Sequence, residues 1–220
     1  MKNLWIASLF LMGCTTGGGG LTFKSDLAVA PDLKGGSGGD MAMSMPDLAM
    51  SNNKPDLAMN GGMCVADPNY GALGTKKGQA VADDDGAGNQ ILLWEGPIDS
   101  QMLPTLLSVQ FYAGAGAFKG STTVKTGTFQ IAGQELNFAT CGVCVLLFTQ
   151  VDTKNMTQGP TYLATGGTVK ITSVNGTLAA TVSNVTFEHV QIDPDTYEST
   201  PDADMCQSAI TSVAFSDTIM

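Results

Sequence analysis

The chain has 220 residues and a formal net charge of −10, because twenty acidic residues outnumber ten basic ones, all of them lysine. Only 14% of the residues are charged, against about 25% in average proteins, so hydroxyl and amide groups must make up much of the surface. Nucleic acid and phosphate esters are therefore poor partners, because their recognition relies on positive charge and bidentate arginine contacts. Cations, neutral glycans and proteins remain open as partners.

Residues 1–13 have the layout of a signal peptide. Lys2 precedes an apolar run from Leu4 to Met12, and Gly13 and Cys14 follow it. The apolar run is about half as long as a membrane-spanning helix requires. We therefore expect a leader that is removed rather than a membrane span.

The segment LMGC at 11–14 resembles the lipobox of bacterial lipoproteins. The resemblance implies that the thiol of Cys14 carries diacylglycerol, that the leader is cut before this residue, and that acyl chains such as palmitate anchor the amino end to a membrane. Thr15 follows the cysteine in place of aspartate, which in such lipoproteins implies passage to the outer membrane, facing the periplasm or the cell surface. The alternative is an ordinary secreted protein with a chance Gly-Cys at the cleavage point.

Residues 15–63 contain ten Gly and six Met, and the unit PDLAM occurs at 46–50 and again at 55–59. A tract this rich in Gly, Pro and Asp cannot bury enough apolar surface to order itself, so residues 14–63 are predicted to be the lipidated cysteine and a disordered tether. The repeats resemble the tethers of surface lipoproteins from gliding bacteria. Thioethers also bind Cu(I), so a second interpretation is a copper-binding segment that uses Met41, Met43, Met45, Met50, Met59 and Met63.

Residues 64–220 are predicted to form one β domain, because short apolar runs alternate with turn residues and no window has a convincing helical period. The run 143–151, VCVLLFTQV, is apolar on both faces, which is typical of a central strand. The predicted fold class is all-β, a β-sandwich of about eight to ten strands, with a closed barrel as the alternative. The other clear strand candidates are 90–94, 106–112, 122–131, 161–165 and 209–216.

The clearest local pattern is a hairpin over 168–182. Asn175 and Gly176 suit a two-residue type I′ turn, and this register places Ile171 opposite Ala180 on the apolar face. Further along, the spacing of apolar residues changes parity after Val182, which predicts a bulge or corner at 183–184.

Five cysteines become four once Cys14 is lipidated. Outside the cytoplasm these four are expected to form two disulfides, and four cysteines allow three pairings. We favour Cys64 with Cys206, which would join the two ends of the domain, and Cys141 with Cys144.

The cysteines of CGVC at 141–144 also have the spacing of thioredoxin-like redox motifs, but a strand-forming run follows them and the βαβ context is missing. A zinc site formed by Cys141, Cys144, His189 and one of Cys64 or Cys206 lacks a second close-spaced pair. His189 is the only histidine, and no G-x-S-x-G pattern accompanies it as the mark of a hydrolase. We therefore interpret CGVC as a structural staple.

Calcium is a stronger candidate ligand. The loop DDDGAGN at 83–89 resembles the D-x-D-G-x-G-N loops of calcium-binding repeats, with Asp83, Asp85 and Asn89 as the candidate ligands. A second acidic loop contains Asp193, Asp195, Glu198, Asp202 and Asp204. The alternative for both segments is a solvated hairpin loop.

The function predicted from these patterns is that of an envelope lipoprotein without catalytic activity or a cofactor, whose domain binds a protein or glycan ligand or serves a structural purpose. Two alternatives remain open. One is a calcium- or copper-binding envelope protein, and the other is a hydrolase or thiol-redox enzyme that uses His189 or the pair Cys141 and Cys144.

Overall fold

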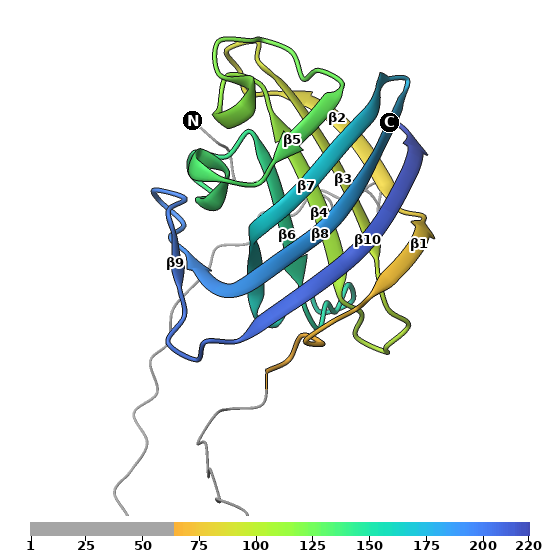
Figure 1. Cartoon of the computed structure of the whole chain (residues 1–220), viewed down its shortest axis with the longest axis vertical. Coiled ribbons are helices and arrows are strands. Elements are labelled where there is room, and N and C mark those ends of the chain that lie inside the picture. Colours follow the sequence, from red (N-terminus) through yellow and green to blue (C-terminus); the bar gives the residue numbers. More distant parts are fainter. Residues whose placement is uncertain (1–63) are drawn as a thin grey trace, which may run out of the picture. The chain divides into compact units, whose positions relative to one another are not determined.

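The computed structural model describes residues 64–220, which form ten strands and two short 3-10 helices (Figure 1). The predicted leader, the predicted lipidation site Cys14 and the methionine tract lie outside the described residues. Within residues 64–220 no helix is long and apolar enough to cross a membrane. The elements in chain order are β1 (Ala72–Lys76), β2 (Gln79–Asp84), β3 (Gln90–Pro97), β4 (Leu106–Tyr112), η3 (Gly116–Phe118), β5 (Gly127–Gln130), η4 (Gly133–Leu136), β6 (Val143–Phe148), β7 (Thr161–Asn175), β8 (Thr177–Ile192), β9 (Ser199–Pro201) and β10 (Gln207–Thr218).

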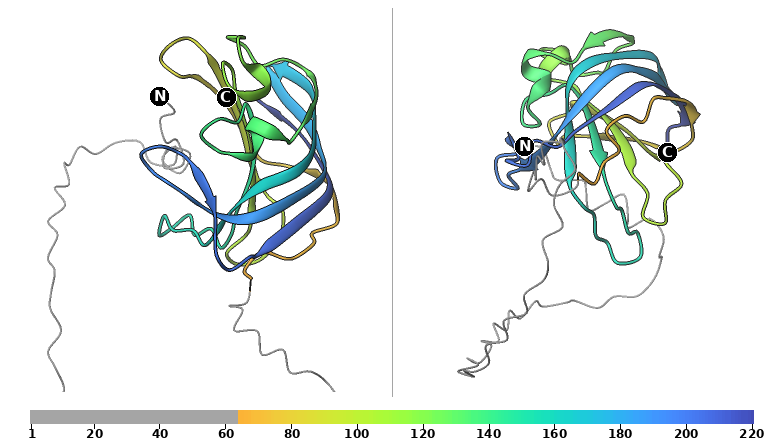
Figure 2. Two further views of the ribbon diagram at one scale, coloured as in Figure 1. Left: turned by 60° about the vertical axis from the view of Figure 1, so that its left-hand side comes forward. Right: turned by 60° about the horizontal axis from the view of Figure 1, so that its bottom comes forward.

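The strands form one strongly curled sheet (Figures 1 and 2). Its order is β1-β10-β8-β7-β6-β4-β3-β2, with β5 paired to β7 and β9 to β8, and only the β1–β10 pair is parallel among the pairs of named strands in the described domain. The curl brings β2 back towards the end of β10, where Ala80 forms a bridge with Ile219. The prediction of an all-β domain with about eight to ten strands is confirmed, and all ten strands belong to one continuous curled sheet.

The main apolar core lies inside this curl. Trp94 of β3 stacks on Phe215 of β10, with the ring centroids 4.2 Å apart. Beside them the carboxylate of Asp217 accepts hydrogen bonds from Nε1 of Trp94 at 2.8 Å, from the backbone N–H of Gly78 at 3.1 Å and from Nζ of Lys77 at 3.3 Å. Asp217 therefore links β10 to β3 and to the segment before β2 at the place where the curl closes.

Strand β6 is buried on both faces, as its apolar sequence predicts. Val143, Val145 and Leu147 point into the main core, whereas Leu146 and Phe148 join a second apolar cluster. β6 pairs with β4 on one side and β7 on the other, so it is a central strand.

The long β7–β8 hairpin has the predicted register but not the predicted turn. Ile171 pairs with Ala180, as expected. Asn175, however, pairs with Thr177 and does not adopt a positive φ, whereas Gly176 has a φ of 66°. A type I′ turn needs positive φ at both central positions, so that prediction was wrong. A register shift between Ile171 and Ser173 absorbs the difference, which is why the apolar pairs still meet.

The predicted irregularity at 183–184 is present. Asn184 has a φ of 50°, and the β7–β8 register shifts between Gly166 and Thr168 on the opposite strand. This bulge lets Val182 and Val185 both point into the core although they lie three positions apart, an odd step that would place them on opposite faces of a regular strand.

Three strands were not predicted, namely β1, β2 and β9, and β5 covers only part of 122–131. These strands are short and mostly exposed, and their sequences lack a sustained apolar alternation. Strand β7 joins the predicted strand at 161–165 to the first strand of the predicted hairpin, and β8 continues beyond 182 to Ile192. Strand β10 extends two residues beyond 209–216 at each end.

Candidate functional site

The two cysteines of CGVC are bonded to each other, and Cys64 is bonded to Cys206, with Cα–Cα distances of 5.5 Å in both pairs. This is the favoured pairing. Cys141 and Cys144 are both fully buried. Thiol–disulfide exchange requires a thiolate to reach a sulfur atom, so this burial disfavours a redox role. All the cysteines of the cysteine-based zinc site considered from sequence are therefore joined in disulfides.

The peptide between these cysteines is held by a buried carboxylate that no motif revealed. Oε2 of Glu135 accepts hydrogen bonds from the backbone N–H groups of Gly142 at 2.8 Å and Val143 at 2.6 Å, and Oε1 accepts one from Ala117 at 2.6 Å. A Cβ at Gly142 would overlap the backbone of Ala115. Close packing and hydrogen bonding thus account for the sequence between the two cysteines without any chemistry at sulfur.

His189 lies on β8, beside the turn that connects β9 to β10. Its Nδ1 is 2.7 Å from Oδ2 of Asp204 and 4.0 Å from Oδ1 of Asp202, and its ring lies 5.4 Å from the ring of Tyr162. Within residues 64–220 its ring pairs with carboxylates rather than with a serine or threonine hydroxyl. These contacts give no support to the hydrolase interpretation of His189, which stays a prediction.

The structure divides the second acidic loop. Asp202 and Asp204 lie with His189 in a group whose ligand atoms are all within 4.8 Å of one another, the one such group in the described domain. The pKa of Asp202 is lowered, first by the hydrogen bond from Nε2 of Gln191 and then by the backbone N–H of Asp204. Asp193 instead accepts backbone N–H groups within its own turn.

The DDDGAGN loop connects β2 to β3 and is organised by Asp85. One carboxylate oxygen of Asp85 accepts the N–H groups of Ala87 and Asn89, and the other accepts the side-chain amide of Asn89 at 2.7 Å. The side-chain and backbone bonds from Asn89 lower the pKa of Asp85. No three carboxylates of this loop come together as a metal-binding group in residues 64–220, and calcium binding by Asp83, Asp85 and Asn89 stays a prediction.

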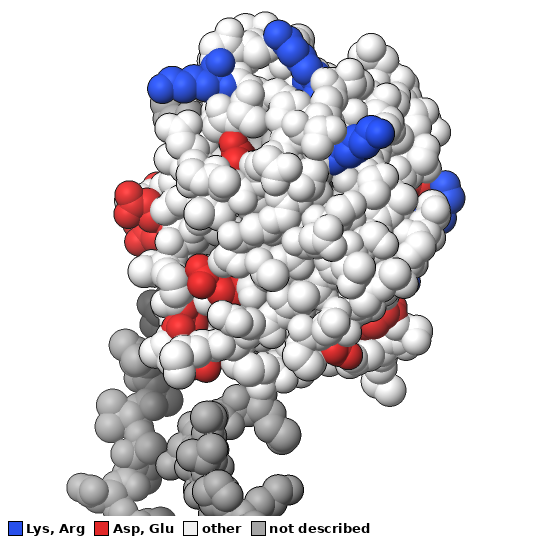
Figure 3. Space-filling model, viewed as in Figure 1, with Lys and Arg blue, Asp and Glu red and all other residues white. Residues whose placement is uncertain are grey.

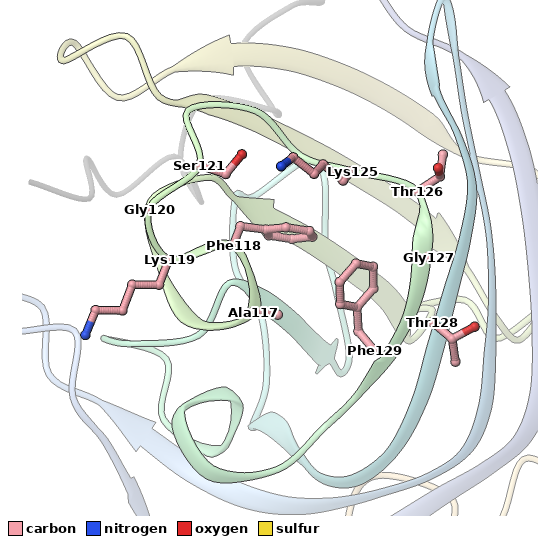
Figure 4. A pocket seen from close by; sticks show the side chains of 10 residues that line it. All are labelled: Ala117, Phe118, Lys119, Gly120, Ser121, Lys125, Thr126, Gly127, Thr128 and Phe129. Carbon is pink, nitrogen blue, oxygen red and sulfur yellow. The ribbon is translucent and has the colours of Figure 1, made fainter.

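An open pocket of about 380 Å³ lies between residues 117–121 and 125–129 (Figure 4). Phe118 and Phe129 meet edge to face in it, with ring centroids 4.9 Å apart. Figure 4 shows Lys125 reaching towards Ser121 across the top of these rings, whereas Lys119 points outward. The lysines are notable because residues 64–220 contain fifteen acidic residues and six lysines.

Charges of the two signs are partly separated on the surface. On the face drawn in Figure 3, lysine side chains gather towards the upper end, where η3 and β5 lie in Figure 1, and most acidic side chains lie lower down. An anion approaching the upper end of this face therefore meets positive charge although the domain as a whole is negative.

A second pocket, of about 430 Å³, surrounds Glu95 of β3 and includes Lys77, Gln79, Leu106 and Thr153 in its wall. Burial raises the pKa of Glu95 to about 7. This carboxyl group therefore changes its charge close to neutral pH, a property that the sequence did not suggest.

No protein-family model matches the chain, and neither a curated protein nor a solved structure does. Function must therefore be argued from the residues themselves.

Proposed function

We propose that this protein is a non-catalytic lipoprotein of the bacterial outer membrane, in which a lipid on Cys14 and a tether over 15–63 present a disulfide-linked β domain for ligand binding. The observation that carries this proposal is the LMGC segment at 11–14, placed at the end of a leader-like apolar run. Cysteine use agrees with it, because four of the five cysteines pair with one another and Cys14 is the fifth.

The candidate catalytic groups support a non-catalytic domain. The sulfur atoms of CGVC are bonded and buried, and the ring of His189 contacts carboxylates. Neither feature places a nucleophile beside a base.

The ligand-binding surface in this proposal is the pocket of Figure 4. It combines a lysine ammonium group at Lys125, the partly exposed ring of Phe129 and the hydroxyl groups of Ser121 and Thr126. These groups suit a sugar that carries a carboxylate, because an ammonium group binds the anion while the hydroxyl groups and the ring contact the sugar. We therefore propose an acidic glycan as the ligand class.

Acylation can be tested by metabolic labelling with an alkyne analogue of palmitate in a Gram-negative host. Wild-type protein should carry the label and sediment with membranes, and Cys14→Ser should lose both properties. Thr15→Asp is the matched variant, since it keeps the thiol and should stay labelled while its membrane fraction changes. Labelling of Cys14→Ser at the wild-type level would overturn the anchor.

Ligand binding can be tested with an oligogalacturonate and its neutral methyl ester. The acid should bind and the ester should not, and Lys125→Ala should weaken binding about tenfold, which corresponds to loss of a charged hydrogen bond of about 1.5 kcal/mol. Lys154→Ala removes the same charge from an exposed turn outside the pocket and should change nothing. Equal affinity for acid and ester would contradict the assignment.

A further inference from the structure

His189, Asp202 and Asp204 bring one imidazole nitrogen and two carboxylate oxygens within 4.8 Å of one another. We propose that these three side chains bind a Zn²⁺ ion. The site goes beyond the binding role proposed above, and it differs from the cysteine-based zinc set and from the calcium loop considered from sequence.

The backbone explains why these residues meet. On one side β9 pairs with β8 through Pro201 and Val190, and on the other β10 pairs with β8 through Gln207 and Glu188. Residues 202–206 therefore form an excursion opposite the single residue His189. The peptide of His189 holds both ends of it, since its C=O accepts the N–H of Asp202 at 2.8 Å and its N–H donates to the C=O of Cys206 at 2.9 Å.

The excursion is also anchored covalently, because Cys206 is bonded to Cys64. The ring of His189 packs beside that of Tyr162, and only 16% of its side chain is exposed. The ligand groups therefore belong to a strand and to a turn that is tied down at both ends, so little conformational freedom remains to be lost on metal binding.

The donor set favours zinc over calcium. Zinc accepts imidazole nitrogen and carboxylate oxygen and is commonly held by three protein ligands and one water, whereas calcium requires six to eight oxygen ligands. Tetrahedral coordination with metal–ligand bonds near 2.1 Å separates the ligand atoms by about 3.4 Å. The Nδ1 distances to Asp204 and Asp202, 2.7 Å and 4.0 Å, lie on either side of that value.

Each ligand keeps a supporting contact that orients it. Oδ2 of Asp202 accepts the side-chain amide of Gln191 at 2.8 Å, and Oδ1 of Asp204 accepts the N–H of Cys206 at 2.9 Å. Oδ1 of Asp202 accepts the N–H of Asp204 at 3.2 Å and keeps a second lone pair. This atom and Oδ2 of Asp204 are the carboxylate oxygens nearest to Nδ1. Such contacts orient metal ligands in known sites. Zinc takes the lone pair of Nδ1, so a proton on that nitrogen moves to Nε2 or to solvent.

The single histidine makes a direct test available. The mature full-length protein is prepared without a histidine tag, labelled with ¹⁵N-histidine, treated with EDTA and titrated with ZnCl₂. We expect one zinc per chain and a large change in the Nδ1 resonance of His189. CaCl₂ at the same concentrations should leave this resonance unchanged.

Affinity measured by competition with a chromogenic chelator should fall at least about tenfold in His189→Gln and in Asp204→Asn. Asp195→Asn removes a carboxylate of the same acidic hairpin outside the group and is the matched control, with unchanged affinity. Asp204→Asn keeps an oxygen that can accept the N–H of Cys206, so it decides the outcome if His189→Gln does not fold. The proposal would be overturned if the Nδ1 resonance of His189 did not change on addition of zinc, or if Asp204→Asn bound zinc with the wild-type affinity.

Discussion

Replacing Glu135 by alanine should destabilise the domain more than any surface substitution. Its carboxylate accepts three backbone N–H groups, of which those of Gly142 and Val143 are buried. A hydrogen bond to a charged group contributes about 1.5–3 kcal/mol, so loss of the two buried bonds alone should lower the free energy of unfolding by about 3–6 kcal/mol. That is a large part of the roughly 5–15 kcal/mol by which domains are stable.

Urea unfolding followed by the fluorescence of Trp94, the one tryptophan after the predicted leader, measures this change. Gln134→Ala, the exposed neighbour in η4, is the control and should shift the free energy of unfolding by less than about 0.5 kcal/mol. Glu135→Gln, which retains one acceptor oxygen, should fall between the two. A decrease below about 1 kcal/mol in Glu135→Ala would refute the reasoning, because the buried N–H groups would then have found other partners.

Three further predictions concern other charged or bonded groups. Asp217→Ala should lower the free energy of unfolding by about 2–4 kcal/mol, because it removes the acceptor for Trp94, Gly78 and Lys77. Burial opposes ionisation of Asp217, but these hydrogen bonds outweigh burial and lower its pKa. In acid titrations the wild type should therefore lose this stabilisation below about pH 4. Burial raises the pKa of Glu95 to about 7, so between about pH 4 and pH 7 the folded state binds more protons than the unfolded state. The free energy of unfolding therefore falls as the pH rises through this range. Glu95→Gln should be more stable than the wild type by about 1–2 kcal/mol at pH 8 and equally stable at pH 4. Dithiothreitol without denaturant should leave the disulfide between Cys141 and Cys144 intact in a thiol assay, because the attacking thiolate cannot reach the buried sulfur atoms. Rapid reduction of this disulfide would support the redox interpretation instead.

Some of the fold could be predicted from sequence because the spacing of apolar residues along a strand depends on the local backbone geometry. The apolar faces of 168–182 set the pairing of Ile171 with Ala180, and the parity change after Val182 marked the bulge at Asn184. The type I′ turn predicted at Asn175 was wrong because the register shifts between Ile171 and Ser173 on the same strand, so that Asn175 pairs with Thr177. No local sequence pattern predicts that shift.

The candidate sites depend on contacts between residues far apart in sequence, which is why they were harder to predict. His189 was identified as the only histidine, but its partners come from the turn after β9, a strand too short and exposed to show in the sequence. Glu135 was not singled out at all, because a buried carboxylate that accepts backbone N–H groups looks like any surface glutamate in the sequence. The disulfide pairs were accessible because four cysteines leave few pairings.

The intact mass of the protein purified from membranes tests the central claim most directly. We predict a chain that begins at Cys14, carries diacylglycerol and acyl groups on that residue, and lacks four hydrogens because Cys64–Cys206 and Cys141–Cys144 are bonded. An unmodified chain that begins at any other residue would contradict the account.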